Sequence, residues 1–226
     1  MTDASTPTSA FIATPTLDGL LSVHYTGALL RSQALLQRER IGCEIRFEIG
    51  NSLIADARNK LVAGFLASAH TDLVFIDADL SWQPADLLRL LRHDADVVAG
   101  AYQRKDRAKV DFSVKFGPRI QADTQGLLPA ERVGTGFLRI RRTVLERLVA
   151  AHPQLALRKH DGSPAPHLYA LFDTSIVDGR YVGEDFTFCD RWRALGGQVM
   201  VDPEIGLAHH GSAAYDEPLK KYLLRD

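Results

Sequence analysis

The sequence predicts an α/β protein built on a mixed, mostly parallel sheet that is flanked by helices. Short apolar segments alternate with helical patterns through the first hundred residues. Strands that alternate with helices at this spacing are typical of parallel sheets. After residue 103 the apolar runs become shorter and alternate with polar residues, which indicates a smaller antiparallel part. We therefore expect a single domain with two halves, residues 10–102 and 103–211.

The first half should contain a Rossmann-like series of strands and helices. Its strands are expected at 11–13, 43–49, 73–76 and 96–102. The first helix is expected from Leu17 onward, and the third from Pro84, because proline suits the first turn of a helix. The second helix places Arg58 and Asn59 outside its apolar face, which is formed by Leu53, Ala57, Leu61 and Phe65.

The second half should be less regular. Short strands are expected within 110–140, helices at 143–151 and 186–195, and an edge-like strand at 198–201. Residues 152–180 contain five prolines and glycines, so we expect an irregular insertion there. Residues 207–210 are expected to be extended, which turns His209 and His210 to opposite sides. Residues 1–9 are expected to form a disordered tail, and residues 212–226 a tail or short helix.

Composition limits the classes of function. The chain has 226 residues, a net charge of −1 and two cysteines, Cys43 and Cys189. Bulk nucleic-acid binding is not expected, because a charge this close to zero provides no attractive field. The cysteine spacing is neither metal-type nor redox-type, so we expect packed thiols in a reducing compartment. Without a basic leader or an apolar run of roughly 20 residues, no transmembrane segment is expected, and the protein should be cytoplasmic or peripheral to a membrane.

Two aspartates close the third expected strand. Asp77 and Asp79 follow the apolar run 73–76, and residues i and i+2 of an extended chain point to the same side. Converging carboxylates repel each other unless a positive charge lies between them, and a hard divalent cation satisfies both. Open parallel sheets bind ligands at this edge. The alternative is that Asp79 or Ser81 only caps the following helix.

Four segments together resemble the GT-A glycosyltransferases, in particular the family 2-like enzymes. They are Phe11-Ile-Ala-Thr-Pro15 at the first strand, Phe75-Ile-Asp-Ala-Asp79 as a D-x-D motif, Gly183-Glu-Asp185 at a helix start, and His209-His-Gly211 as a late H-x-G element. The resemblance extends over roughly residues 10–211. It implies the GT-A fold, with a nucleotide-sugar-binding half followed by an acceptor-side half.

The resemblance also implies a reaction. One sugar would move from a nucleotide-sugar donor, a UDP- or GDP-sugar, to an unknown acceptor hydroxyl. Mn²⁺ or Mg²⁺, held by Asp77, Asp79 and His209, would stabilise the departing diphosphate. Asp185 would take the proton of the acceptor, with Glu184 beside it, and a single base implies inversion at the anomeric carbon.

Donor contacts are implied at the first βα turns. The residues that the resemblance places there are Thr14, Thr16, Asn51, Arg58 and Asp77. The sequence departs from the family 2 pattern after the second strand, where Gly50-Asn51-Ser52 replaces an expected acidic residue, so the preference for a nucleobase stays open. Arg104 and Lys105 are candidates for diphosphate contacts or for a solvated charged face.

Three other functions use similar elements. A haloacid-dehalogenase-type phosphatase also carries D-x-D after an apolar strand, but normally on its first strand, whereas a βαβα segment precedes the motif here. A sugar-nucleotidyltransferase needs a glycine-rich first turn, which residues 13–19 do not provide. The third alternative is a non-catalytic sugar- or nucleotide-binding module, although every expected catalytic position is filled.

Overall fold

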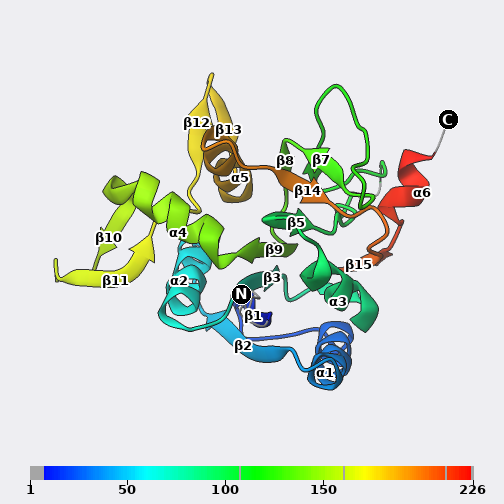
Figure 1. Ribbon diagram of the computed structural model, residues 1–226, viewed down its shortest axis with the longest axis horizontal. Helices are drawn as coiled ribbons and strands as arrows, with labels where there is room; N and C mark the ends of the chain where they lie inside the picture. Colours follow the sequence, from blue (N-terminus) through cyan, green and yellow to red (C-terminus); the bar gives the residue numbers. More distant parts are fainter. Residues whose placement is uncertain (1–7, 107, 160, 212, 225–226) are drawn as a thin grey trace, which may run out of the picture.

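The computed structural model describes residues 8–106, 108–159, 161–211 and 213–224 (Figure 1). Seven strands form its central sheet: β1 (Ser9–Thr16), β2 (Gly42–Ile49), β3 (Asp72–Ile76), β5 (Val97–Ala99), β7 (Leu128–Ala130), β9 (Phe137–Arg141) and β14 (Val199–Val201). Their order is β2-β1-β3-β9-β5-β14-β7. Five strands share one direction, because only β9 and β7 pair antiparallel with their neighbours. The predicted mixed, mostly parallel sheet is confirmed.

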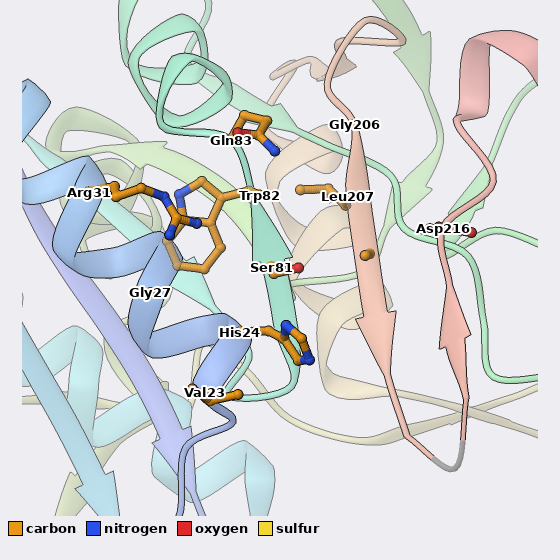
Figure 2. A pocket seen from close by; sticks show the side chains of 11 residues that line it. Val23, His24, Gly27, Arg31, Ser81, Trp82, Gln83, Gly206, Leu207 and Asp216 are labelled. Carbon is orange, nitrogen blue, oxygen red and sulfur yellow. The ribbon is translucent and has the colours of Figure 1, made fainter.

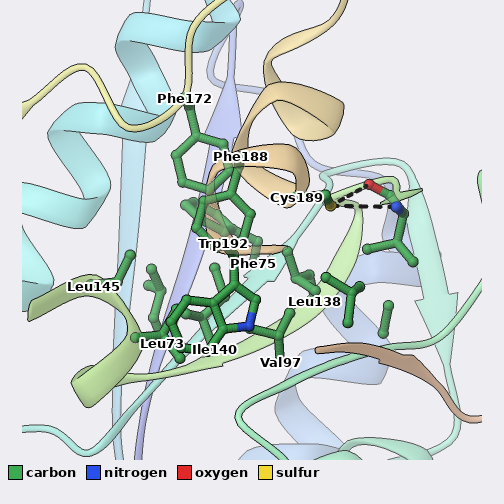
Figure 3. Close-up of a cluster of buried hydrophobic side chains, with 14 of the residues drawn as sticks. Leu73, Phe75, Val97, Leu138, Ile140, Leu145, Phe172, Phe188, Cys189 and Trp192 are labelled. Carbon is green, nitrogen blue, oxygen red and sulfur yellow. Dashed lines mark hydrogen bonds between the residues drawn. The ribbon is translucent and has the colours of Figure 1, made fainter. Parts of the chain in front are cut away.

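Helices cover both faces of this sheet. The described helices are α1 (Val23–Arg38), α2 (Ile54–Ala67), α3 (Pro84–Arg92), α4 (Arg142–Ala151), α5 (Glu184–Ala194) and α6 (Leu219–Leu223). Alternate residues of β1, β3, β5, β9 and β14 enter two separate cores, as the two-residue period of a strand requires. Phe75 of β3 packs with Phe172, Phe188 and Trp192 on the face covered by α2, α4 and α5 (Figure 3). Ile76 packs on the opposite face, under α1 and α3.

Small antiparallel sheets form the rest of the structure. They contain β4 (Leu80–Trp82), β15 (Leu207–His210) and β16 (Ala214–Tyr215); β6 (Val114–Lys115) and β8 (Arg132–Val133); β10 (Ala156–Arg158) and β11 (Pro164–Tyr169); β12 (Ser175–Val177) and β13 (Arg180–Val182). The predicted antiparallel part is therefore present. However, β9 belongs to the central sheet, where it lies between β3 and β5.

The prediction of an irregular insertion at residues 152–180 is wrong. This segment contains a 3-10 helix, η1 (Pro153–Leu155), and two hairpins, β10–β11 and β12–β13. Asp178 and Gly179 both have positive φ and form the tight turn of the second hairpin. Gly179, which was expected to interrupt regular structure, therefore belongs to the turn that joins β12 and β13.

Three other elements differ from the prediction. The first helix begins at Val23 and not at Leu17, because Ser22 caps it by accepting a hydrogen bond from the Tyr25 amide at 3.0 Å. Strand β14 is not at an edge of the sheet, since it lies between β5 and β7. Most of the predicted N-terminal tail, residues 1–7, lies outside the described residues, whereas Ser9 belongs to β1.

Arg58 and Asn59, outside the predicted apolar face of α2, are buried. The Asn59 side chain donates to the carbonyl of Phe172 at 2.7 Å and accepts from its amide at 2.9 Å. The segment that leads to β12 therefore covers a second face of α2. Burial on two faces explains why the apolar pattern of this helix did not predict its contacts.

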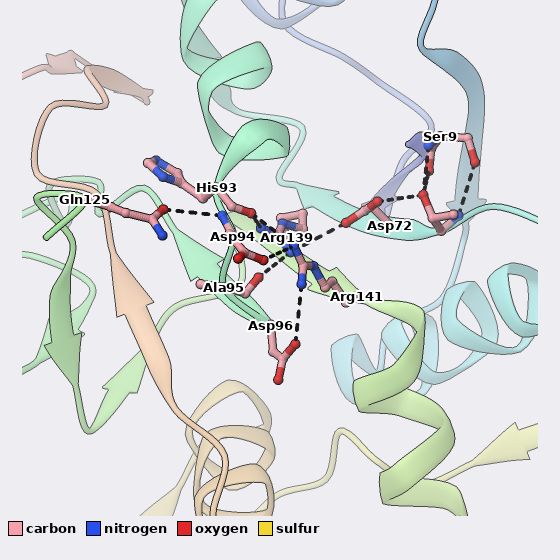
Figure 4. Close-up of polar contacts among 10 residues, drawn as sticks. Ser9, Asp72, His93, Asp94, Ala95, Asp96, Gln125, Arg139 and Arg141 are labelled. Carbon is pink, nitrogen blue, oxygen red and sulfur yellow. Dashed lines mark hydrogen bonds and ion pairs between the residues drawn. The ribbon is translucent and has the colours of Figure 1, made fainter. Parts of the chain in front are cut away.

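A fully buried arginine lies in the middle of the sheet. Arg139 of β9 donates to the carbonyls of His93 and Ala95 at 2.7 and 2.6 Å, and its Nη1 lies 3.5 Å from the Asp72 carboxylate (Figure 4). These contacts join the loop before β5 to the start of β3. No helix in the described part of the chain combines the length and apolar character that crossing a bilayer requires.

Both cysteines are free thiols. Cys189 is buried and Cys43 half-buried. Burial raises the pKa of Cys43 to about 11 and that of Cys189 to about 12, so both thiols stay protonated and unreactive at neutral pH.

Candidate functional site

The carboxyl end of β3 opens into a pocket of about 620 Å³. Asp77 and Asp79 follow the strand directly, and both are half-buried there. Their pocket is lined by Pro15, Thr16, Leu17, Asp18, Leu20, Leu21, Ser22, Ile54, Arg58, Asp77, Ala78, Asp79, Tyr102 and His209. Of the residues predicted from the sequence, the structure therefore brings Thr16, Arg58, Asp77, Asp79 and His209 together around one pocket.

Asp79 lies between two basic side chains. Its Oδ2 is 3.4 Å from His209 Nε2, and it forms an ion pair with Lys105 Nζ. Burial acts to raise the pKa of Asp79, but the hydrogen bonds and charges of His209 and Lys105 outweigh it and lower the pKa to about 2. Asp79 is therefore ionised throughout the neutral pH range.

The two consecutive histidines face opposite sides of β15, as predicted. His209 Nδ1 lies 2.9 Å from the carbonyl oxygen of Gln103, whereas His210 Nε2 lies 2.7 Å from Ser81 Oγ and its ring stacks on that of His24. A carbonyl only accepts, so Nδ1 of His209 carries the proton. Nε2, on the other side of the ring, is the nitrogen that faces Asp79.

Arg58 joins the two acidic ends of the site. From α2 it reaches Asp77 Oδ1 through Nη2 and Glu184 Oε1 through Nε, each at 3.2 Å. Its side chain is 6% exposed, and its guanidinium lies over the Phe75 ring at 5.5 Å. Opposite charges on both sides offset the cost of burying it. Glu184 is therefore held close to the end of β3, although the two are distant in the sequence.

Asp185, next to Glu184, has a raised pKa. Burial, followed by the charge of Glu184, raises its pKa to about 6, and Asp77 adds to the effect. It follows Glu184 in the first turn of α5, where its Oδ1 accepts from the Phe186 amide at 2.8 Å. A carboxylate with a pKa near neutrality holds a proton more readily than ordinary aspartates do, which is the property required of a general base.

Thr14 and Asn51 lie away from the pocket. The Thr14 side chain is fully buried, with its hydroxyl 2.5 Å from that of Tyr25. Asn51 donates to Asp56 at 2.7 Å and accepts from the Leu53 amide, so it shapes the start of α2. Thr16 does line the pocket, and its hydroxyl donates to the Leu20 carbonyl at 3.0 Å.

Tyr102 and Lys105 complete the site. The sequence offered Lys105 only as one of two basic candidates, and Tyr102 only as the end of a strand. Tyr102 lines the pocket, and its ring lies 5.1 Å from that of His209. A signal was present in the sequence, since Gly134 and Gly136 leave space that the Tyr102 ring fills.

A second hollow, of about 520 Å³, lies between α1 and the β4–β15 pair (Figure 2). His24, Arg31 and Ser81 point towards it, and Trp82 forms part of its wall. The Trp82 indole N–H donates to Ser32 at 2.9 Å, and the side chain is 3% exposed. Trp82 is thus a core residue.

Asp79 and His209 fit a divalent metal in their donor chemistry. A carboxylate with an imidazole nitrogen suits Mn²⁺ better than Mg²⁺. Asp77 is engaged by Arg58, and no group of three or more His, Cys, Asp or Glu side chains that could hold a metal occurs among the described residues. An ion here would therefore have Asp79 and His209 as protein ligands and would take the place of the Lys105 ammonium.

Comparisons with known proteins give structural similarities only. No family model matches the sequence, and no curated protein matches it. The chain is similar to a Drosophila beta-1,4-galactosyltransferase 7 mutant in a complex with manganese, UDP-Gal and xylobiose, with 17% identity over 97% of this chain and 74% of that chain and a TM-score of 0.49. The similar structures include a second glycosyltransferase.

That enzyme, involved in glycosylation of the major capsid of PBCV-1, is 7% identical over 64% of this chain and 66% of its own, with a TM-score of 0.35. A mannose-1-phosphate geranyltransferase from Thermus thermophilus is 15% identical over 65% of this chain and 61% of its own, with a TM-score of 0.38. These values are too low to assign a function, so the proposal below rests on the geometry of the site.

Proposed function

We propose that the protein is a metal-dependent glycosyltransferase that moves one sugar from a nucleotide-sugar donor to an acceptor hydroxyl with inversion. The observation that carries this proposal is the Arg58 bridge. It holds Glu184, and with it the neighbouring Asp185, beside the aspartates at the end of β3. Neither Glu184 nor Asp185 lines the pocket itself, but Asp185 is near enough to Asp77 and Arg58 for their charges to act on it. A group able to take a proton therefore lies near carboxylates and a histidine that suit a metal and a diphosphate.

The residues around the pocket have different proposed roles in the reaction. Asp79 and His209 would hold Mn²⁺ or Mg²⁺, which when bound neutralises the charge of a diphosphate leaving group. Thr16 and Arg58 line the part of the pocket proposed for the nucleotide, a UDP or GDP moiety. Lys105, which pairs with Asp79, is placed to contact phosphate oxygens.

Asp185 is the proposed base. Its carboxylate takes the proton of the acceptor hydroxyl while that oxygen bonds to the anomeric carbon, and the bond from this carbon to the diphosphate oxygen breaks. With one such group the displacement is direct, and the configuration inverts. Glu184, fixed by Arg58, keeps a negative charge beside Asp185 and helps to raise its pKa.

A panel of UDP- and GDP-sugars, each with and without Mn²⁺, tests the proposal. We expect metal-dependent release of a nucleoside diphosphate from one donor, and no hydrolysis of p-nitrophenyl phosphate, which a phosphatase would cleave. Asp185→Asn should reduce the rate of transfer by roughly 10²-fold or more, with calorimetric binding of UDP or GDP retained. Unchanged transfer in this variant would remove the assigned base.

A further inference from the structure

Tyr102 lies between the acidic side chains of the site and His209. It follows β5, and its ring packs edge-to-face against His209, with the centroids 5.1 Å apart and the planes at 77°. It also lies close enough to Asp77, Arg58 and Asp185 for their charges to act on its hydroxyl. Tyr102 is therefore in contact with His209 and close to Asp77.

Gly134 and Gly136 pack tightly against Tyr102. A Cβ atom on Gly136 would come within 2.6 Å of the Tyr102 ring and 2.8 Å of Asp77 Oδ2. A Cβ atom on Gly134 would come within 2.6 Å of the Tyr102 hydroxyl. These distances are shorter than real contacts of a Cβ atom, so both glycines are required by the ring. The ring and the Asp77 carboxylate therefore share one tightly limited space.

The residue after Tyr102 acts on the same histidine. The Gln103 carbonyl lies 2.9 Å from His209 Nδ1, which fixes the proton there and leaves Nε2 facing Asp79. The Gln103 side chain is buried and accepts from the Glu217 amide at 3.2 Å. Two consecutive residues thus contact the imidazole of His209. Tyr102 packs against the ring, and the carbonyl of Gln103 accepts from its Nδ1.

We propose that Tyr102 is a positioning residue for the transfer reaction, whose ring holds Asp77 and His209 in the arrangement that receives the metal and the diphosphate. The inference rests on the proposed function. The contacts that support it are those of the ring, which packs edge-to-face against His209 and fills the space that Gly134 and Gly136 leave. The contribution of Tyr102 comes from the shape of the ring.

Two variants distinguish the contribution of the Tyr102 ring from that of its hydroxyl. Tyr102→Phe keeps the ring and should leave kcat/KM within about threefold of the wild type. Tyr102→Leu removes the ring and should lower kcat/KM by about 10- to 100-fold, the range found when partners of metal ligands are lost. A loss of more than about tenfold in Tyr102→Phe would show that the hydroxyl takes part, and would overturn a role for the ring alone.

A spectroscopic measurement needs neither a donor nor a metal. Long-range proton–nitrogen NMR correlations at about pH 8 report which nitrogen of His209 carries the proton. The wild type and Tyr102→Phe should show a single Nδ1–H tautomer, and Tyr102→Leu a mixture. Should Tyr102→Leu keep both the wild-type tautomer and the wild-type kcat/KM, Tyr102 positions nothing.

The glycines provide a matched pair for the packing argument. Gly134→Ala should be partly rescued in a Tyr102→Phe background, because the shortest clash is with the hydroxyl that phenylalanine lacks. Gly136→Ala should not be rescued, because it clashes with the ring and with Asp77. Equal rescue of both would contradict the arrangement. Absence of transfer with every donor would overturn the proposed function instead, while the tautomer would still decide the role of Tyr102.

Discussion

At the scale of single residues, the acidic side chains of the site differ in whether a basic side chain forms an ion pair with them. Asp77 has Arg58 and Asp79 has Lys105, whereas Asp185 has no ion-pair partner among the described residues that would lower its pKa to the usual range. Burial acts to raise the pKa of both Asp79 and Asp185, but the basic partners of Asp79 lower its pKa, whereas that of Asp185 stays raised. This difference supports the separate roles proposed for two of the acids, cation binding at Asp79 and proton transfer at Asp185.

The first prediction concerns the pH dependence of transfer. Asp185 accepts a proton only when ionised, and its pKa is about 6. We expect kcat/KM to fall about tenfold per pH unit below about pH 6 and to be level from about pH 7 to 8. Calorimetric binding of UDP with Mn²⁺ across the same range separates this effect from a loss of nucleotide or metal binding. A profile that stays level down to about pH 4.5 would exclude Asp185 as the base.

The second prediction concerns stability. The folded pKa of Asp185 is raised, so its contribution is fully present below its unfolded pKa of about 4 and is lost as the pH rises through about 6. Asp185→Asn removes this penalty, and should raise the free energy of unfolding at pH 8 by about 1–3 kcal/mol more than at pH 4.5. Urea titrations at both pH values measure the difference.

The exposed Asp173 is the control for this measurement. Asp173→Asn should change the free energy of unfolding by less than about 0.5 kcal/mol at either pH, as is usual for surface substitutions. If Asp185→Asn gains no more stability at pH 8 than at pH 4.5, the surroundings do not penalise the ionised carboxylate, and the raised pKa is wrong.

At the scale of elements, α2 shows what a sequence pattern can and cannot predict. Its existence and its apolar face against the sheet followed from the spacing of Leu61 and Phe65, and both are buried as expected. The burial of Arg58 and Asn59 did not, because their partners Glu184 and Phe172 lie more than a hundred residues away in the sequence. The spacing of apolar residues in a helix predicts which face packs against the sheet. Polar contacts with a segment distant in the sequence produce no such spacing, so the pattern does not predict them.

The third prediction follows from Asn59. Asn59→Ala leaves the Phe172 carbonyl and amide buried without their partners, which should lower the free energy of unfolding by about 2–3 kcal/mol. Lys60→Ala is the control on the same helix, because its ion pairs with Glu48 and Asp56 are exposed, and it should cost less than about 1 kcal/mol. Urea denaturation measures both, and equal costs would refute the assigned role of Asn59.

At the scale of the whole molecule, the fold class and the grouping of the acidic motifs were predictable, but the strand order was not. Alternating strands and helices indicate a parallel sheet, and the D-x-D, Glu-Asp and H-x-G motifs indicate which of its ends carries the site. The insertion of β9 between β3 and β5 depends on pairing between distant strands, such as Val74 with Arg139. Strands β3 and β5 are buried on both faces and almost continuously apolar, so their sequences do not identify their neighbours.

The fourth prediction is that the two halves do not fold separately. A fragment of residues 1–102 lacks β9, and so leaves β3 and β5 without the strand that joins them. We expect this fragment to give a collapsed NMR spectrum without protected amides, and the full chain to unfold in one cooperative transition in urea. A dispersed spectrum of the fragment would show that the first half is an independent domain.

The late position of β9 in the chain also bears on biosynthesis. A ribosome completes β5 at Ala99, and then has about 40 further residues to add before Arg141 ends the strand that both β3 and β5 require. At roughly 5–20 residues per second, the nascent chain keeps two apolar strand edges unpaired for roughly 2–8 seconds. Chaperones that shield such edges during translation should therefore raise the yield of native protein more than those added after release.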